Sequence, residues 1–380
     1  MKTAKILWGA TDLGAPHFSS DILWRTGFRA PDAFFLIEIG GKTWLFLSPL
    51  EIGRAHKEAR ADHLVLTERF AKRGEVSAQG LARFLRGRGV RKVLVAHAFP
   101  HGIARLLREH FSLHDAGHTL YPERACKTTR EIAEICSAQR ACEEAMAAGI
   151  AFLRKCKIKG TRVYDQDRVV TSEMIRRVVG DALWRRGYLG SGTIVACGIQ
   201  AADPHCMGWG PIAARRPIVM DVFPVSLESH YYADMTRTVF KGRPSPDDIR
   251  MYEAVAKAQE IAFGAVRAGA DGATIHAAAK EYLASQKYPT DTKRSPAEGF
   301  IHGLGHGVGI DIHEAPHMGV GGAVLEEGNV VTIEPGLYYH RPRRGIPAGG
   351  IRLEDMVLVM KSGGRNLTKF PKGIAPAIIP

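Results

Sequence analysis

The chain has 380 residues, more than one compact core usually holds, so we expect two domains. Hydrophobic residues make up 45% and charged residues 24% of it, and no apolar run reaches the length of about 18 residues that a membrane span needs. The first ten residues hold too short an apolar stretch for a secretory leader, so we expect a cytoplasmic protein without a membrane anchor.

The net charge of +13 permits binding to nucleic acid or to an anionic surface. The lysines and arginines are dispersed, however, over expected helix faces and loops, and no recognised nucleic-acid motif accompanies them. We therefore expect a solvated basic surface and no nucleic-acid partner.

The first third of the chain alternates strand-like and helix-like segments. Residues 34–39 and 42–48 are β-rich runs separated by Gly40-Gly41, which predicts a two-residue hairpin. The next expected elements are a helix at 81–88, a strand at 91–96 and a helix at 103–110. This order predicts an α/β layer domain, which we place at residues 1–125.

The remainder, residues 126–380, begins with a helical pattern. Thr128 and Glu131 form a capping box that opens a long helix, for which we expect packing and no chemical role. Ser245-Pro246, a cap followed by proline at the first helical position, predicts a second long helix. Four strand-like stretches follow or separate these helices, at residues 217–225, 231–240, 330–339 and 351–360. Helices beside antiparallel-looking strands predict an α+β fold.

Each of the four strand-like stretches carries an acidic residue in its apolar run. The acids are Asp221 in IVMDVFPV, Asp234 in YYADMTRTVF, Glu334 in VVTIEPGLYY and Glu354 in GGIRLEDMVLVM. A carboxylate buried in a strand is costly unless it is paired or coordinates a cation. Four such strands are hard to explain by packing, so we expect a bound cation.

Histidines add a second kind of ligand. The glycine-rich segment 300–316 holds three of them, and Gly305 and Gly307 flank His306, where they allow close approach of the backbone. Carboxylates with an imidazole suit Mn, Fe, Co or Zn. Four negative charges overbalance one divalent ion, which indicates two ions that share carboxylates and a water of depressed pKa. We therefore expect a hydroxide nucleophile that bridges two metal ions.

These motifs resemble those of the pita-bread metallopeptidases, the family of Xaa-Pro dipeptidase, aminopeptidase P, methionine aminopeptidase and creatinase. The matching segments are IVMD, ADMTRT, GHGVGIDIHE, TIEPG and GIRLED. The resemblance implies five metal ligands, namely Asp221, Asp234, His306, Glu334 and Glu354. It further implies that Asp234 and Glu354 bridge the two ions and that Glu334 also transfers a proton.

The resemblance assigns other roles as well. It implies that His205 and His313 steady the substrate and the tetrahedral intermediate without binding metal, and that Arg352 orients the ligands or the substrate. The segment SSDILWRTGFRAPDAFFLIEIGG resembles the accessory domain of prolidases and creatinases. The chain is therefore expected to hold a pita-bread domain of α+β type behind a smaller α/β domain, and to form a homodimer.

Three departures from the family pattern concern the pocket and the length of the substrate. Phe223 stands where the family has glycine, two residues after Asp221, and Pro224 follows it. The spacing of 13 residues between Asp221 and Asp234 is longer than expected for prolidases. A basic loop at residues 340–344 lies between the two glutamates and is expected to bind the C-terminal carboxylate of a dipeptide.

The leading prediction is an exopeptidase that hydrolyses Xaa-Pro bonds of small peptides with two divalent ions, of which manganese is the first choice and cobalt, zinc or iron the alternatives. The bond is a tertiary amide whose nitrogen offers no N–H. One alternative is a metal enzyme of the same fold that acts on a non-peptide small molecule. Another is a catalytically silent binding module, against which the intact ligands count. Dipeptidase and aminopeptidase action, and the residue preferred before proline, stay open.

Overall fold

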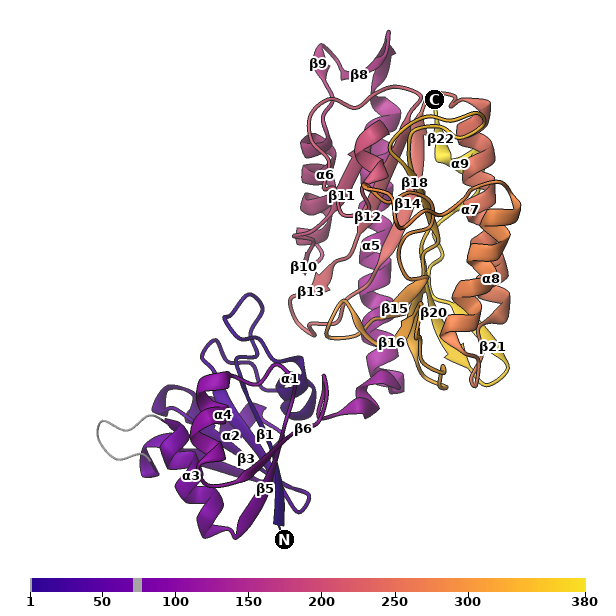
Figure 1. Ribbon diagram of the computed structural model, residues 1–380. Coiled ribbons are helices and arrows are strands. Elements are labelled where there is room, and N and C mark those ends of the chain that lie inside the picture. The colour runs from indigo at the N-terminus through magenta and orange to yellow at the C-terminus, as the bar shows by residue number, and fades with distance from the viewer. Residues whose placement is uncertain (1, 71–76) are drawn as a thin grey trace. The chain divides into compact units, whose positions relative to one another are not determined.

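The computed structural model describes residues 2–70 and 77–380. The chain divides into two compact units, of which the first ends at Arg124 and the second spans Ala125–Pro380 (Figure 1). None of the helices in the described ranges is both long enough and apolar enough to cross a membrane.

The first unit contains a six-stranded mixed sheet with helices on both faces. Its strands in spatial order are β4 (His63–Leu66), β3 (Lys42–Leu47), β2 (Phe34–Ile39), β1 (Lys2–Gly9), β5 (Val90–Val95) and β6 (Ser112–Asp115). Its helices are α1 (Ser20–Thr26), α2 (Pro49–Glu58), α3 (Ser77–Gly87) and α4 (His101–Arg108). Successive strand residues point to opposite faces, so Ile6 packs in the core with α3 and α4 and Leu7 in the core with α1 and α2. The predicted α/β layer domain is confirmed.

The predicted hairpin joins β2 and β3 of this sheet. Gly40 and Gly41 have φ angles of 58° and 79°, the left-handed values that a tight two-residue turn between twisted strands requires. The register then pairs Ile39 with Lys42 directly across the turn. The glycine pair therefore sets both the turn and the pairing of the two strands.

The second unit begins with two helices packed on a sheet. These are α5 (Thr129–Lys155) and α6 (Ser172–Trp184), and the sheet has the order β11 (Ile194–Cys197), β12 (Pro217–Val222), β14 (Met235–Lys241) and β22 (Ile378–Ile379). Three minor elements accompany them, namely the sheet β7 (Lys157–Lys159), β8 (Arg162–Asp165) and β9 (Arg168–Val169), the pair β10 (Tyr188–Leu189) and β13 (Val225–Ser226), and the short helix η3 (Gly198–Ala202). Both partners of the capping box make their bonds: Thr128 Oγ1 accepts from the Glu131 amide, and the Glu131 carboxylate accepts from the Thr128 amide. The predicted start of α5 is confirmed.

The later half of the second unit repeats this plan. Its helices α7 (Pro246–Ala265) and α8 (Gly272–Ser285) are followed by a sheet with the order β16 (Glu314–Met318), β15 (Gly305–Gly307), β17 (Val330–Ile333), β20 (Asp355–Met360) and β21 (Gly363–Asn366). A pair, β18 (Gly336–Tyr339) with β19 (Gly349–Arg352), and the short helix α9 (Ile374–Ala377) complete it. The helix predicted at Ser245-Pro246 is present as α7, with Ser245 as its cap.

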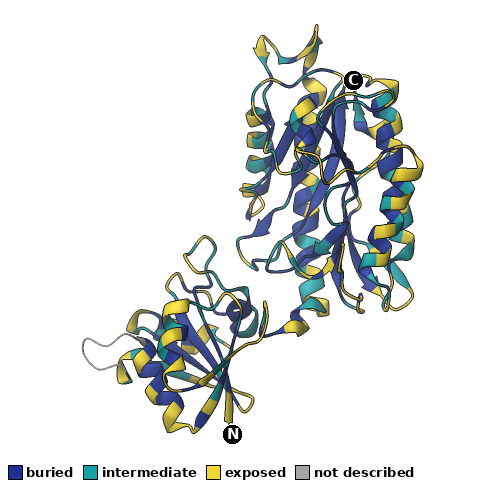
Figure 2. Cartoon of the chain, in the orientation of Figure 1, coloured by how far each residue is buried: buried dark blue, intermediate teal, exposed yellow. Residues whose placement is uncertain are grey.

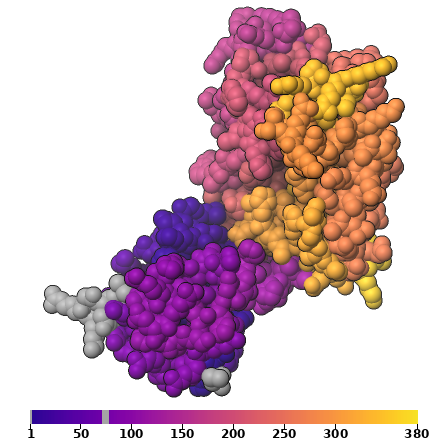
Figure 3. Space-filling view, in the orientation of Figure 1, coloured from indigo at the N-terminus to yellow at the C-terminus, as the bar shows by residue number. Residues whose placement is uncertain are grey.

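Burial follows this layered plan. In Figure 2 the strands of the second unit are mostly dark blue, whereas the outer faces of its helices are yellow. In the space-filling view the magenta earlier part and the orange-to-yellow later part of this unit lie side by side on the visible face (Figure 3). The strands β11, β12, β14, β17, β18, β19 and β20 are thus mostly interior, and most of their side chains are withdrawn from bulk solvent.

The strand-like stretches that carry the acids are more broken than predicted. The predicted strand 330–339 is two strands, β17 and β18, separated at Glu334, and the predicted strand 351–360 is divided between β19 and β20 at Glu354. Strand β14 begins only after Asp234. At both glutamates the chain passes between the five-stranded sheet and the β18–β19 pair. Asp234, Glu334 and Glu354 therefore lie where ladder pairing stops, whereas Asp221 lies within β12 and is paired with β11 and β14.

Candidate metal centre

A cavity of about 490 Å³ lies within the second unit, and all eight predicted site residues line it. They are His205, Asp221, Asp234, His306, His313, Glu334, Arg352 and Glu354. The volume is in the range of small-molecule sites, which bury most of a ligand.

The strand pairing explains how residues so far apart in sequence meet. Strands β12 and β14 are antiparallel partners, and this pairing brings Asp221 near Asp234, which directly precedes β14. Strands β17 and β20 are also antiparallel partners, and Glu334 directly follows one while Glu354 directly precedes the other. His306 is the middle residue of β15, the neighbour of β17. Each ligand candidate is thus carried by an element end or a short strand.

Three of the candidates form a compact group. One ligand atom each from Asp234, His306 and Glu354 lies within 4.8 Å of the others. His306 Nε2 is 3.7 Å from Asp234 Oδ2 and 3.5 Å from Glu334 Oε1. The Thr236 hydroxyl donates to Glu354 Oε2 at 2.8 Å, which fixes the orientation of that carboxylate. The spacing suits donor atoms that surround a cation.

Arg352 lines the cavity and contacts three other residues of the site. Its Nη2 lies 2.6 Å from Asp221 Oδ2, its Nε donates to the Thr236 hydroxyl at 3.1 Å, and its Nη1 donates to the Tyr338 hydroxyl at 3.0 Å. Among the described residues that line the cavity it is the one lysine or arginine. One guanidinium therefore faces four carboxylates, so the cavity carries an excess of negative charge when these groups are ionised.

The pKa values of three of the carboxylates are raised by burial and by their like-charged neighbours. Burial, then the neighbouring Glu354 and Asp221, raises the pKa of Asp234 well above its usual value, and burial with Glu354 does the same for Glu334. Burial and Asp221 raise the pKa of Glu354 to about 7. Within the described ranges, Oδ1 of Asp221 and Oδ1 of Asp234 are buried without a hydrogen-bond partner. Buried unpartnered anionic oxygens in a cavity are the pattern that divalent cations satisfy.

Two histidines of the cavity have strongly lowered pKa values because they are buried. Burial lowers the pKa of His306 and of His302 to about 3. The Gly307 carbonyl oxygen lies 3.1 Å from His306 Nδ1 and accepts a hydrogen bond from it, which leaves Nε2 to face the carboxylates. The ring of His313 lies 4.3 Å from that of His306 at an interplanar angle of 89°. His306 is thus oriented as a metal ligand requires.

Sequence reasoning missed four polar contacts of this site, which involve Thr236 and Tyr338. Thr236 links Glu354 to Arg352, and Tyr338 accepts from Arg352 and lies 2.8 Å from His302 Nε2. Thr236 follows Asp234 by two residues in ADMTRT, and this same-face spacing was a usable signal. Tyr338 had none, because its partner is brought to it by the β18–β19 pairing.

A model of metallopeptidase family M24 matches residues 133–361, which is more than half of the chain. The chain belongs to metallopeptidase family M24. The match spans every predicted ligand, and it confirms the predicted class of enzyme, a metal-dependent hydrolase of peptides.

Relatives of known name agree with the family. The M24 chain is 36% identical over 178 residues to a Xaa-Pro dipeptidase of Pyrococcus furiosus, a stretch that covers 47% of each chain. It is 26% identical over 339 residues to a Xaa-Pro dipeptidase of Pyrococcus horikoshii, covering 88% of this chain and 86% of the relative. The solved prolidase of Pyrococcus furiosus superposes with a TM-score of 0.76 at 24% identity, over 98% of this chain and 97% of that one. The predicted pita-bread fold behind a smaller N-terminal domain is confirmed.

Phe223, where this M24 chain departs from the family pattern, lines the same cavity. Strand β12 ends just before it, since the next residue is Pro224, which cannot donate to a ladder. The ring packs on Gly192, where an added Cβ would lie only 2.4 Å from two ring carbons. The aromatic side chain therefore occupies space beside Asp221 and shapes one wall of the cavity.

The basic loop does not reach the centre. None of residues 340–344 is among the described residues that line the cavity. Arg343 instead pairs with the buried Glu298, and Arg344 lines a separate cavity of about 620 Å³ beside Arg250. Arg343 is therefore already paired, and the binding of a substrate carboxylate by this loop stays a prediction.

Proposed function

We propose that this M24 member is an exopeptidase that uses two divalent metal ions to hydrolyse Xaa-Pro bonds. The observation that carries the proposal is the excess of buried carboxylate charge: four acids line one cavity, and Arg352 is the guanidinium that faces them. Dinuclear peptidase sites need such a surplus to balance four positive charges. The choice of the Xaa-Pro bond rests on relatives named Xaa-Pro dipeptidase.

The residues present fit two ions. Asp221, Asp234, His306, Glu334 and Glu354 would hold them, and Asp234, His306 and Glu354 already bring one ligand atom each within 4.8 Å of the others. We propose manganese, with cobalt, zinc and iron as the alternatives, because mostly oxygen donors with one imidazole suit these metals. When bound, such a pair acts as a Lewis acid that lowers the pKa of a water molecule and polarises the peptide carbonyl.

The chain's own side chains supply the proton transfers and the binding of the substrate. When an Xaa-Pro bond breaks, the proline nitrogen must gain a proton to leave as an amine, and we assign that transfer to Glu334, 3.5 Å from His306. His205 and His313 line the cavity beside the carboxylates and are assigned to hydrogen bonds with substrate oxygens. Arg352 keeps Asp221 in place through their 2.6 Å ion pair.

The test combines metal analysis with a peptide panel. The purified protein is stripped, reloaded separately with Mn, Co, Zn or Fe, and assayed on Xaa-Pro dipeptides, Xaa-Pro-Yaa tripeptides and non-peptide amides. We expect about two ions per chain and hydrolysis of the dipeptides. A clear preference for the tripeptides excludes the dipeptidase form, and hydrolysis of non-peptide amides alone supports the alternative that Phe223 suggests.

Asp234→Asn is the decisive variant. It removes a negative charge from the centre with little change of shape, and we expect loss of activity by about a thousandfold or more, with an unchanged circular dichroism spectrum. Asp167→Asn, whose side chain is 99% exposed, is the matched control and keeps full activity. A fully active Asp234→Asn protein contradicts the ligand assignment. A metal content near zero in the reloaded wild type supports the alternative that the chain is a catalytically silent binding module.

We further propose a cytoplasmic homodimer that acts on small peptides and binds neither membrane nor nucleic acid. The support is the kind of relative matched and the dispersion of the basic residues along the sequence. Sedimentation equilibrium tests the dimer, and a monomer at micromolar concentration contradicts it.

A further inference from the structure

Lys127 is a buried cation just before helix α5. Its side chain is 1% exposed, and Nζ lies 2.6 Å from Glu314 Oε1 and 3.1 Å from the carbonyl oxygen of Ala125. A buried ammonium is tolerated only where such partners satisfy it. The two residues of the ion pair are 187 positions apart, so the contact ties the beginning of α5 to a distant segment.

Glu314 belongs to the segment that carries His313. We call residues 309–314 the His313 loop. The second carboxylate oxygen of Glu314 accepts from the Asp311 amide at 3.4 Å, and the carboxyl group is seated on Gly309, where an added Cβ would meet it at 2.5 Å. One carboxylate therefore contacts Gly309 and Asp311, two residues of the loop that precede His313.

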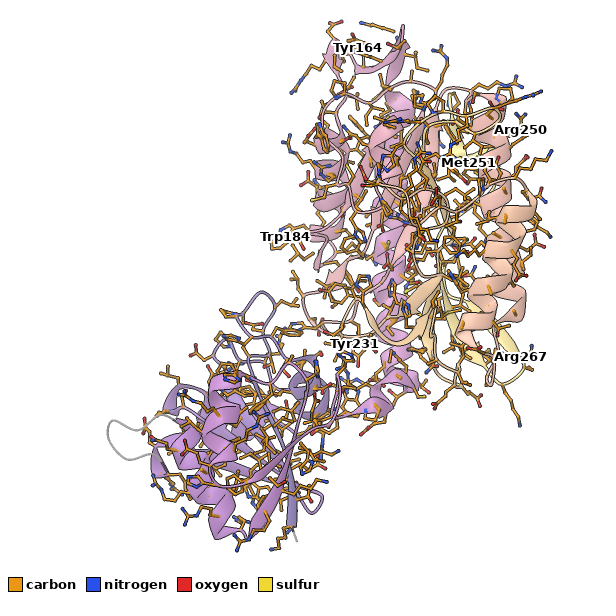
Figure 4. All side chains as sticks on the ribbon, in the orientation of Figure 1. Tyr164, Trp184, Tyr231, Arg250, Met251 and Arg267 are labelled. Atoms are coloured by element: carbon orange, nitrogen blue, oxygen red, sulfur yellow. The ribbon has the colours of Figure 1, made fainter. Side chains whose placement is uncertain are left out.

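The first turn of α5 is also linked to the His313 loop through Tyr231 and Tyr232. The Tyr231 hydroxyl donates to Glu131 Oε1 at 2.7 Å, and the adjacent Tyr232 amide donates to the Gly309 carbonyl oxygen at 2.8 Å. Tyr231 is labelled in Figure 4, at the end of the unit where β16 lies in Figure 1. The start of α5 is thus linked to the loop directly through Lys127 and indirectly through Tyr231 and Tyr232, a role beyond the packing expected from sequence.

The backbone of Lys127 is anchored separately from its side chain. Its amide donates to the Gly328 carbonyl oxygen at 2.8 Å, and Asn329 Nδ2 donates to the Ala125 carbonyl oxygen at 3.0 Å. Replacement of the Lys127 side chain therefore removes the ion pair and leaves the path of the segment in place. This makes the ion pair separable by mutation.

We propose that Lys127 is a positioning residue for His313: its ion pair with Glu314 fixes the His313 loop and so keeps His313 packed across the ring of His306. The centroids of those two rings are 4.3 Å apart. The proposal rests on the peptidase function above for its kinetic consequence, but its structural consequence is independent of any activity.

The structural consequence is tested by hydrogen exchange of the metal-free protein. Lys127→Met keeps the length and packing of the side chain but removes the ammonium group that lies 2.6 Å from Glu314 Oε1. We expect the amides of the His313 loop to exchange about tenfold faster or more, whereas those of α7 stay unchanged. The double variant Lys127→Met/Glu314→Gln removes both charges of the ion pair. Comparison of its hydrogen exchange with that of Lys127→Met separates the loss of charge pairing from a loss of fold. Unchanged exchange in Lys127→Met overturns the proposal.

The kinetic consequence is tested by a double-mutant cycle. We expect Lys127→Met to lower kcat by about 10- to 100-fold through displacement of His313, with an unaltered metal content. In a His313→Ala background the same change has little further effect, because its target is absent. An equal loss in both backgrounds shows a merely structural role and contradicts the proposal. Lys159→Met, which removes an exposed ion pair with Asp167, is the matched control and leaves kcat unchanged.

The two proposals fail separately. If the metal-loaded wild type hydrolyses no Xaa-Pro peptide, the proposed function is wrong, and the exchange of the His313 loop still decides whether Lys127 positions it. If the wild type hydrolyses these peptides while neither exchange nor kcat responds to Lys127→Met, only the positioning role is wrong.

Discussion

Glu354 and Asp355 are consecutive, buried acids with opposite surroundings. Asp355 is matched by cations: Arg237 Nη2 lies 2.7 Å from one of its oxygens, and Lys372 Nζ lies 2.5 Å from the other. Glu354 projects into the metal-centre cavity, where it meets other carboxylates and a threonine hydroxyl. Burial alone raises both pKa values. The cations reverse that effect and hold the pKa of Asp355 below its usual value, whereas the pKa of Glu354 is raised to about 7.

The first unit repeats the balanced arrangement. Asp21 is buried against Arg124 at 2.5 Å and accepts from the Thr119 hydroxyl and the Leu120 amide. Each of these two buried acids, Asp355 and Asp21, is therefore paired with at least one cation. The metal-centre cavity differs from these two places, because four carboxylates there face one guanidinium. Bound metal ions would supply the positive charge that balances the other carboxylates.

Removal of the matched acid should have the largest effect on stability. Asp355→Asn leaves the buried Arg237 without its anion, and we expect the free energy of unfolding to fall by about 3–5 kcal/mol. Urea denaturation of the metal-free protein measures it. Glu260→Gln, which breaks the exposed pair with Lys257, is the control and should cost about 1 kcal/mol at most. A loss of about 1 kcal/mol or less in Asp355→Asn would show that the cations around Asp355 do not distinguish it from the unmatched Glu354.

Addition of metal should stabilise the unmatched region by a smaller amount. At a free ion concentration 100 times Kd, we expect the free energy of unfolding to rise by about 2.7 kcal/mol. Thermal denaturation with and without Mn²⁺ measures this, and Asp234→Asn is expected to lose most of the gain. If the ion raises the melting temperature of Asp234→Asn as much as that of the wild type, it binds elsewhere.

Neutralising one acid of the cavity should stabilise the metal-free protein. Glu354→Gln removes one of four like charges and keeps an oxygen that accepts from Thr236, so we expect a gain of about 1–2 kcal/mol at pH 8. The adjacent Asp355→Asn is the comparison and changes stability in the opposite direction. Destabilisation by both variants in metal-free protein would show that Glu354 is structural.

The smallest effect concerns the uncharged wall of the cavity. Gly192→Ala forces the Phe223 ring to move, and we expect KM for Xaa-Pro peptides to change by about threefold to tenfold, with little change in metal content. Gly180→Ala is the matched control, because an added Cβ there meets nothing within 4 Å. Equal KM values for the two variants would show that the position of Phe223 does not influence the substrate.

Local patterns predicted much of this fold. The glycine pair at Gly40-Gly41, the capping box at Thr128 and the proline after Ser245 each act within a few residues, so the sequence shows the turn or helix start that the structure contains. The apolar runs around the acids likewise indicated strands and a charge that packing does not explain. These signals are short-range, and they do not depend on the rest of the chain.

Tertiary structure decided what lies beside these elements. The change of sheet at Glu334 and Glu354 divides two of the predicted strands, and the pairing of β12 with β14 brings Asp221 and Asp234 to the same cavity. Arg343 of the basic loop pairs with Glu298 and does not line the cavity, and the pairing of Lys127 with Glu314 spans 187 positions. Such contacts depend on which segments the sheets bring together, and no local pattern encodes them. The sequence by itself determined which residues have the chemistry of a metal centre, and the fold decided which of their charges are left unbalanced.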